Sequence, residues 1–219
     1  MRRMIALALM LIPSSLLGQR SALREVRDRG AFGINVAVAQ AFGAFRRNGD
    51  GAVGITAFGV TGGKTLGLRI DGGWMVYDYD YQGYGLTTTS QIGTLAVGPQ
   101  ITIGRGPVRL VGFATAGGSL FWTSASDRYA CGCYGSDDFI VDGDFTTTMS
   151  AGVGLLVTVH RGTTPVSFDL GVRGVRHDLV KYVPANGISA NPDGSLTVNR
   201  VESAVEMRVF HFGVSIGIR

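Results

Sequence analysis

The sequence has little charge, and its N-terminal apolar run is too short to cross a membrane as a helix. Charged residues make up 16% of the 219 residues and hydrophobic residues 45%, a balance that excludes an intrinsically disordered chain. The run Met4–Ile12 falls well short of the roughly 20 residues that a membrane-spanning helix needs.

The chain also has no net charge beyond its first 30 residues. Six of the 20 Lys and Arg residues, but only two of the 16 Asp and Glu residues, lie in residues 1–30, so residues 31–219 are neutral overall. The basic character therefore belongs to the N-terminus and gives no argument for nucleic-acid binding.

Glycine, by contrast, is abundant. The 34 glycines are about twice the usual share, and they are scattered through apolar segments without a collagen period. Such a distribution is typical of tightly curved strands whose backbones approach one another closely.

The last ten residues alternate strictly between large apolar side chains and small or polar ones. The large residues are Phe210, Phe212, Val214, Ile216 and Ile218. A period of two places all five on one face of an extended strand. The same arrangement recurs in segment after segment, which suits a barrel with its apolar face toward lipid and its small, polar face toward a lumen.

Residues 1–18 have the features of a secretory signal peptide. Arg2 and Arg3 precede the apolar run, and the small residue Gly18 stands at the expected cleavage point. Because Gln19 rather than cysteine follows, a lipid-anchored N-terminus is excluded. We expect residues 19–30 to be a solvated periplasmic lead-in and residues 31–219 to be the barrel domain.

Eight extended segments follow the lead-in. They are Phe32–Phe45, Gly51–Val60, Thr65–Tyr81, Ser90–Ile103, Val108–Trp122, Phe145–His160, Val166–Tyr182 and the stretch from Leu196 to the end. Short glycine-bearing turns follow the second, fourth and sixth segments, and longer polar connections follow the third, fifth and seventh; the short connection after the first breaks this pattern. The sequence predicts an all-β fold, an eight-stranded antiparallel transmembrane up-and-down barrel with both termini on the short-turn, periplasmic side.

In this pattern the chain resembles the small outer-membrane β-barrel family, which holds the membrane domain of outer membrane protein A and the OmpX and OmpW proteins. In that family the last strand, like Phe210–Ile218 here, carries alternating large apolar residues that the barrel assembly machinery recognises. Family members usually end on an aromatic residue, whereas this chain ends Ile218-Arg219. The resemblance implies a location in the bacterial outer membrane. We expect a monomer that contacts lipid and lipopolysaccharide and binds neither a cofactor nor nucleic acid.

Five side chains are expected to face the lumen at similar heights and to form an ion-paired network. They are Arg69, Asp71, Asp169, Arg173 and His211, with His211 expected beside Arg173. Unpaired charges in a narrow lumen are costly, so we interpret the network as a plug. The alternative is a selectivity site or a gated conduit, but eight strands enclose little more than side chains.

The loop between the fifth and sixth segments carries two cysteines and a cluster of acids. Export favours oxidation of Cys131 and Cys133 to a disulfide, although a ring with one intervening residue is tight. A metal site with two thiolates is the alternative, but the loop has no histidine. The acidic residues are Asp137, Asp138, Asp142 and Asp144. They could take Ca²⁺ or bridge to lipid headgroups, but their spacing matches no calcium loop, so we assign no metal site.

A lipid-processing enzyme must also be weighed, because some barrels of this size process lipid A. His177, Glu202, Ser203 and Glu206 fall on the last hairpin, and a symmetrical loop would place His177 opposite Val201 and diagonal to Ser203. A nucleophile, a base and an orienting acid could be assembled from these residues, but no motif surrounds them. We therefore predict a structural or surface-interaction protein rather than an enzyme; a narrow passive channel for small or apolar solutes is the second hypothesis.

The phase of the final strand changes near Val209 and Phe210. Large residues stand at even positions from Phe210 onward but at odd positions before it, so a regular strand would point Glu206 and Arg208 toward lipid. A β-bulge near Val209-Phe210 would turn both charges into the lumen, and we expect one there. The alternative is that the strand has already left the bilayer at Met207.

Overall fold

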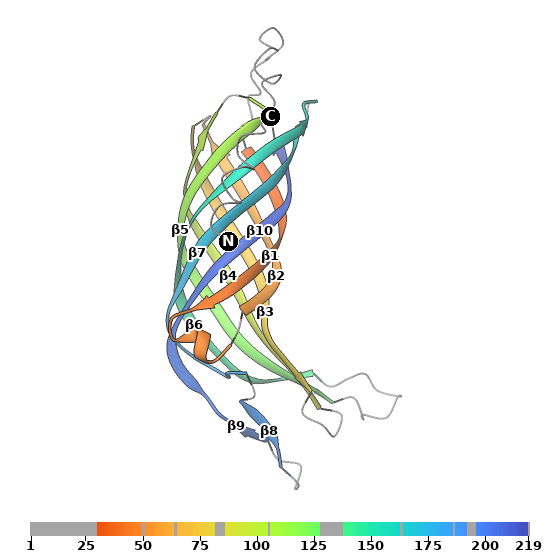
Figure 1. Ribbon diagram of the computed structural model, residues 1–219, viewed down its shortest axis with the longest axis vertical. Helices are drawn as coiled ribbons and strands as arrows, with labels where there is room; N and C mark the ends of the chain where they lie inside the picture. The colour runs from red at the N-terminus through yellow and green to blue at the C-terminus, as the bar shows by residue number, and fades with distance from the viewer. Residues whose placement is uncertain are drawn as a thin grey trace, which may run out of the picture.

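The computed structural model describes residues 30–49, 51–63, 65–81, 86–104, 106–127, 138–162, 164–185, 187–191 and 196–218. Among these residues, eight antiparallel strands close into a barrel in the order β1-β10-β7-β6-β5-β4-β3-β2 (Figure 1). The predicted all-β, eight-stranded antiparallel barrel is confirmed. The predicted signal peptide and most of the lead-in lie outside the described residues, and Gly30 is already the first residue of β1.

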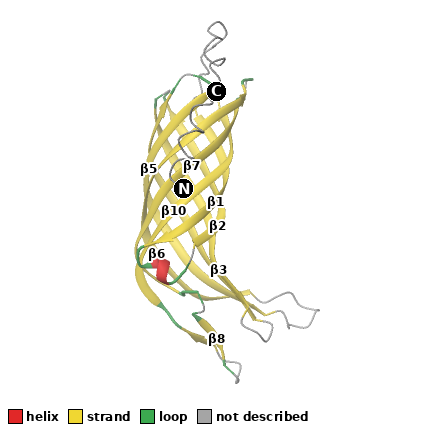
Figure 2. Ribbon diagram, viewed as in Figure 1, coloured by secondary structure: helices red, strands yellow, loops and turns green. Residues whose placement is uncertain are grey.

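Strands account for nearly all of the described chain (Figure 2). The barrel strands are β1 (Gly30–Phe42), β2 (Gly51–Gly62), β3 (Leu66–Tyr81), β4 (Leu86–Ile103), β5 (Val108–Asp127), β6 (Asp138–His160), β7 (Val166–Tyr182) and β10 (Val201–Ile218). Two small elements complete the fold: the 3-10 turn η2 (Phe45–Arg47) and a hairpin of β8 (Ile188–Ala190) and β9 (Leu196–Val198). Among the residues that the structure describes, no helix is long and apolar enough to span a membrane.

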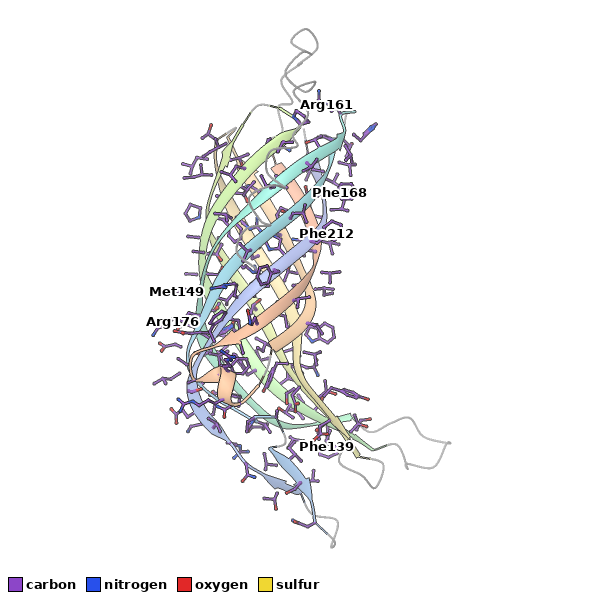
Figure 3. All side chains as sticks on the ribbon, viewed as in Figure 1. Phe139, Met149, Arg161, Phe168, Arg176 and Phe212 are labelled. Atoms are coloured by element: carbon purple, nitrogen blue, oxygen red, sulfur yellow. The ribbon has the colours of Figure 1, made fainter. Side chains whose placement is uncertain are left out.

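The outer face of the barrel is apolar and the inner face is polar or tightly packed, the reverse of a water-soluble protein. In β1, Val36 and Val38 are 62% and 52% exposed, whereas Asn35 and Ala37 are 2% and 0% exposed. On the neighbouring strands, the rings of Phe168 and Phe212 stack with centroids 6.1 Å apart, and both are exposed (Figure 3). A continuous apolar surface of this kind is stable against hydrocarbon and not against water.

The two rims of the barrel differ, as the loop spacing predicts. Short turns join β2 to β3, β4 to β5 and β6 to β7 at one rim, where Gly30 also pairs with Ile218, so the two ends of the barrel sequence meet there (Figure 1). The opposite rim carries η2 and the β8–β9 hairpin. We call these the short-turn rim and the loop rim.

The connection from β1 to β2, which breaks the alternation of loop lengths, folds back into the mouth of the barrel. The chain turns at Gly43, whose φ of +60° suits glycine, and η2 then buries Phe45 completely. The main-chain oxygen of Asn48 accepts a hydrogen bond from the amide of Ala185 at 3.0 Å, which fastens this connection to the segment after β7. The first strand was predicted to run to Phe45 but ends three residues earlier, at Phe42. The turn at Gly43 directs the Phe45 ring into the barrel.

The predicted β-bulge near Val209-Phe210 was wrong. The pairing of β10 with β1 runs without a shift from Glu206 to Ile218, and Arg208 lies on the same face as Phe210. The irregularity between β10 and β7 falls earlier, between Ala204 and Val205, where β7 carries an extra residue.

The inner face explains this phase. Val205, Met207 and Val209 point into the lumen and are at most 3% exposed, because the lumen at this level is packed with apolar side chains. Glu206 and Arg208 are consequently on the lipid side of β10. An arginine facing lipid costs about 2–4 kcal/mol at mid-bilayer but about 0–1 kcal/mol near the interface. The cost of Arg208 on the outer face is therefore small only if it lies at an interfacial level.

Candidate functional site

The lumen is the candidate site, and its half nearer the short-turn rim holds a layer of charged side chains. The structure places all five predicted residues there, each at most 8% exposed: Arg69, Asp71, Asp169, Arg173 and His211. We call them the charged layer. They come from β3, β7 and β10, and in each strand the period of two brings them to the inner face.

Arg69 and Asp71 form the tightest pair of this layer. The two residues are successive inward positions of β3, and the guanidinium of Arg69 donates hydrogen bonds of 2.9–3.0 Å to both carboxylate oxygens of Asp71. A further guanidinium nitrogen donates to Oε1 of Gln100 on β4 at 3.0 Å. Charge-assisted bonds with this fork geometry are the strong ones, so the pair is well satisfied despite its burial.

Two aromatic rings enclose the Arg69 guanidinium. Its Cζ lies 4.0 Å from the ring centroid of Phe58 and 4.1 Å from that of Phe113. A cation–π contact is worth up to about 2 kcal/mol when it is shielded from water. Gly33 makes room for this arrangement, because a Cβ there would overlap the Phe58 ring. The sequence pattern pointed to neither ring; Phe58 lies in the glycine-rich second segment, whose faces the alternation does not resolve.

The rest of the charged layer is held more loosely. Asp169 accepts a hydrogen bond from Nδ2 of Asn35 at 3.2 Å and lies 3.8 Å from Nε2 of His211. The guanidinium of Arg173 lies 3.7 Å from Asp71, and its Nε has no hydrogen-bond partner among the described residues. Asp71 therefore serves two arginines at once. His211 pairs with Gly171, between Asp169 and Arg173 on the facing strand, and its Nε2 lies close to Asp169.

The half of the lumen nearer the loop rim is filled with aromatic rings instead of charges. The rings belong to Phe45, Tyr77, Phe121, His177 and Tyr182, all at most 7% exposed. We call them the aromatic plug. Edge-on contacts link them: ring centroids are 5.5 Å apart for Phe45 and Tyr182, 5.8 Å for Phe45 and Tyr77, and 5.1 Å for Phe121 and His177.

The plug also satisfies the hydroxyl groups that it buries. The Tyr182 hydroxyl accepts from Nδ2 of Asn48 at 2.9 Å and shares a hydrogen bond of 3.2 Å with the Ser203 hydroxyl. The Tyr77 hydroxyl donates to the main-chain oxygen of Val183 at 3.2 Å. Burial of these polar atoms is therefore not penalised, because each has a partner.

A small cavity of about 30 Å³ separates the charged layer from the plug. Arg173 and His177, four residues apart on the inner face of β7, both line it, together with Asp71, Thr115 and Ser150. Neither ring nitrogen of His177 has a hydrogen-bond partner among the described residues. A cavity of this size has room for about two water molecules, and these few polar groups in a mostly apolar wall are their available partners.

The residues considered for catalysis are not assembled. In the observed register His177 pairs with Val205 instead of the predicted Val201, and Ser203 pairs with Val180. The Ser203 hydroxyl bonds to Tyr182, whereas the His177 ring packs on Phe121. Glu206 lies on the outer face near Arg176. The extra residue of β7 and the β8–β9 hairpin break the symmetrical loop closure that the predicted pairing assumed.

Cys131, Cys133 and Asp137 lie outside the described residues, and the side chain of Asp138 is likewise not described. Asp142 pairs with Nε of Arg200 at 2.9 Å. Asp144 accepts hydrogen bonds from the main-chain amides of Phe145 and Lys181. These two carboxylates are thus engaged separately, and no group of three potential ligands gathers for a metal ion in the described part of the chain.

Several solved structures are similar to this chain. Neisserial surface protein A is 14% identical over 88% of this chain and 99% of its own, with a TM-score of 0.48. Ail, the attachment invasion locus protein of Yersinia pestis, is 12% identical over 87% and 97%, with a TM-score of 0.45. A major outer membrane protein from Thermus thermophilus is 12% identical over 85% and 98%, with a TM-score of 0.42.

Identities of 12–14% and TM-scores below 0.5 are too low to transfer a function. No protein-family model matches the chain, and no curated protein is similar to it.

Proposed function

We propose that this protein is an integral barrel of the bacterial outer membrane, with a structural or surface-interaction role and a lumen plugged by its own side chains. The observation that carries the proposal is the filling of the lumen at two successive levels. Charged side chains that pair with one another occupy the first level, and five packed rings occupy the second. A solute would have to displace both layers.

The loop rim is the surface that we propose meets external partners, with the short-turn rim and both termini in the periplasm. In support, the strands β3 to β6 and the β8–β9 hairpin extend beyond the level of η2 at the loop rim (Figure 1). Long connections on one rim and tight turns on the other are the usual asymmetry of outer-membrane barrels.

The proposed partners are outer-membrane lipid and lipopolysaccharide along the wall, and the barrel assembly machinery during biogenesis. The support for the first is the apolar outer face; for the second it is the alternating final strand, of which Phe210, Phe212 and Ile216 are exposed along the outer wall. We propose a monomer without a cofactor or a catalytic activity.

A narrow channel is the second candidate. The cavity between the two layers favours it, because polar groups of Arg173 and His177 already line a space inside the lumen. A channel would require this space to connect to both rims.

Two measurements test the proposal. The refolded protein should migrate differently on a gel before and after boiling, as compact detergent-resistant barrels do, and it should give no conductance steps in a planar lipid bilayer. A protein that is soluble without detergent would contradict the membrane assignment. Stable ohmic steps from the unmodified protein would instead favour the channel.

A further inference from the structure

A groove of about 470 Å³ lies on the outer wall of the barrel, on the side of the loop rim that faces the short-turn rim. The strand register aligns two rows of outward side chains along it, on β10, β7 and β6. The first row is Glu206, Arg176 and Met149; the second is Arg208, Gly174 and Ala151. Met149 and Arg176 lie at the same level on one side of the barrel (Figure 3).

On its side toward the short-turn rim, the groove borders an apolar stretch of the outer wall. The next row toward the short-turn rim consists of Phe210, Val172 and Val153, all apolar. The two charged rows are therefore the first polar level that a lipid chain meets as it runs along the wall toward the loop rim. We take this to be the level at which headgroups border hydrocarbon.

The floor of the groove is open and apolar. Gly174 and Ala151 are both exposed and small, and a Cβ added at Gly174 would meet no atom within 4 Å. Met149, which is 67% exposed, stands beside them. Such a slot offers a hydrocarbon chain contact on its floor and on one wall.

The charge of the groove is positive and only partly compensated. Nε of Arg176 lies 3.8 Å from Glu206, and these side chains are 71% and 45% exposed, so the pair is loose. The guanidinium of Arg208 lies 4.7 Å above the ring of Phe42, which leaves its edges free to donate. Among the described lining residues, two guanidinium groups thus face one carboxylate. Arginine forks match the oxygens of a phosphate group bidentately.

We propose that this groove binds one phosphate-bearing lipid of the surrounding leaflet. The phosphate lies between Arg176 and Arg208, and an acyl chain runs over Gly174 and Ala151. A free phosphate ion would use only the arginines, whereas a lipid uses both the charges and the apolar floor. The proposal rests on the membrane location proposed above.

Native mass spectrometry of the refolded full-length barrel, released from detergent, tests the site. Phosphatidylglycerol is the probe, and phosphatidylcholine with the same acyl chains is the reference. The unmodified protein should retain one phosphatidylglycerol in preference. Arg208→Gln should weaken that binding roughly tenfold, the effect of losing one charged hydrogen-bonding partner. Arg161→Gln, at the short-turn rim (Figure 3), is the matched control and should change nothing.

The floor is tested separately. Gly174→Leu should fill the slot and reduce retention of both lipids. Gly112→Leu on β5 is its control, because a Cβ there also meets no atom within 4 Å. Equal binding by the Arg208 and Arg161 variants, or by the Gly174 and Gly112 variants, would overturn the proposal. So would displacement of the lipid by inorganic phosphate alone.

The gel-shift assay separates failure of the site from failure of the proposed function. A barrel that shows the shift but lacks the lipid preference contradicts only this site. A chain that shows no shift contradicts the membrane location, and the lipid site with it.

Discussion

The two halves of the lumen hold different kinds of side chains. Toward the short-turn rim the barrel holds the charged layer, in which Asp71 serves both Arg69 and Arg173. Toward the loop rim it holds the aromatic plug, to which the connection after β1 contributes Phe45. The same strand, β7, supplies Asp169 and Arg173 to the first layer and His177 and Tyr182 to the second.

The difference shows how the same small lumen can be filled in two ways. Charges fill it only if each one finds a partner, so the charged layer depends on a few specific pairings. Rings fill it by volume without specific charge pairings, so the plug depends on packing. One substitution should therefore lower the free energy of unfolding more in the charged layer than in the aromatic plug.

Asp71→Ala should give the largest loss of stability. It leaves two buried guanidinium groups without their carboxylate, and removal of one partner of a buried pair costs about 3–5 kcal/mol. The midpoint of denaturant unfolding in detergent, followed by the gel shift, measures the loss. Glu206→Gln breaks an exposed pair on the outer wall and should cost less than about 1 kcal/mol. Equal losses for the two variants would contradict the charged layer's role.

Phe45→Ala should cost somewhat less, about 3 kcal/mol, because it removes the ring contacts with Tyr77 and Tyr182 and leaves a cavity. The same denaturant midpoint measures it. Phe210→Ala removes an equally large ring from the outer wall, where detergent replaces it, and is the control. A loss of stability for Phe210→Ala as large as that for Phe45→Ala would contradict a packed aromatic plug.

Tyr182→Phe should have the smallest effect, about 1 kcal/mol. It keeps the ring contacts of the plug and removes only the hydroxyl that bonds to Asn48 and Ser203. Tyr79→Phe, at an exposed position, should leave the unfolding midpoint unchanged. A loss as large as that of Phe45→Ala would mean that hydrogen bonds, rather than packing, hold the plug.

The sequence predicts the charged layer better than the plug, for a physical reason. Charged residues that share a face with small residues in an alternating strand are expected to face the lumen, because the other face is apolar. The alternation of odd and even positions is therefore enough to place Arg69 and Asp71. Tyr77 shares that parity, but aromatic residues near strand ends also suit a membrane interface, so parity does not decide its place. Phe45 cannot be placed from the pattern, because its position depends on the turn at Gly43 and on the contacts of η2 with the chain after β7.

The same limit applies to the last hairpin. Alternation defines which residues share a face, but it does not define which residues pair across strands. The register of His177 depends on the extra residue in β7 and on the β8–β9 hairpin. The predicted phase of Glu206 and Arg208 was wrong because the large residues before Phe210 fill an apolar lumen, which the pattern of the outer wall does not reveal.

We propose that the two layers close the lumen in series. Planar-bilayer conductance of three variants tests it most directly, each first shown to be folded by the gel shift. Arg69→Ala with Asp71→Ala opens only the charged layer, and Phe45→Ala with Tyr182→Ala opens only the plug; both should remain silent, like the unmodified protein. The variant that combines all four substitutions should conduct. Conductance from either double variant alone, or silence from the combined one, would contradict closure by two layers.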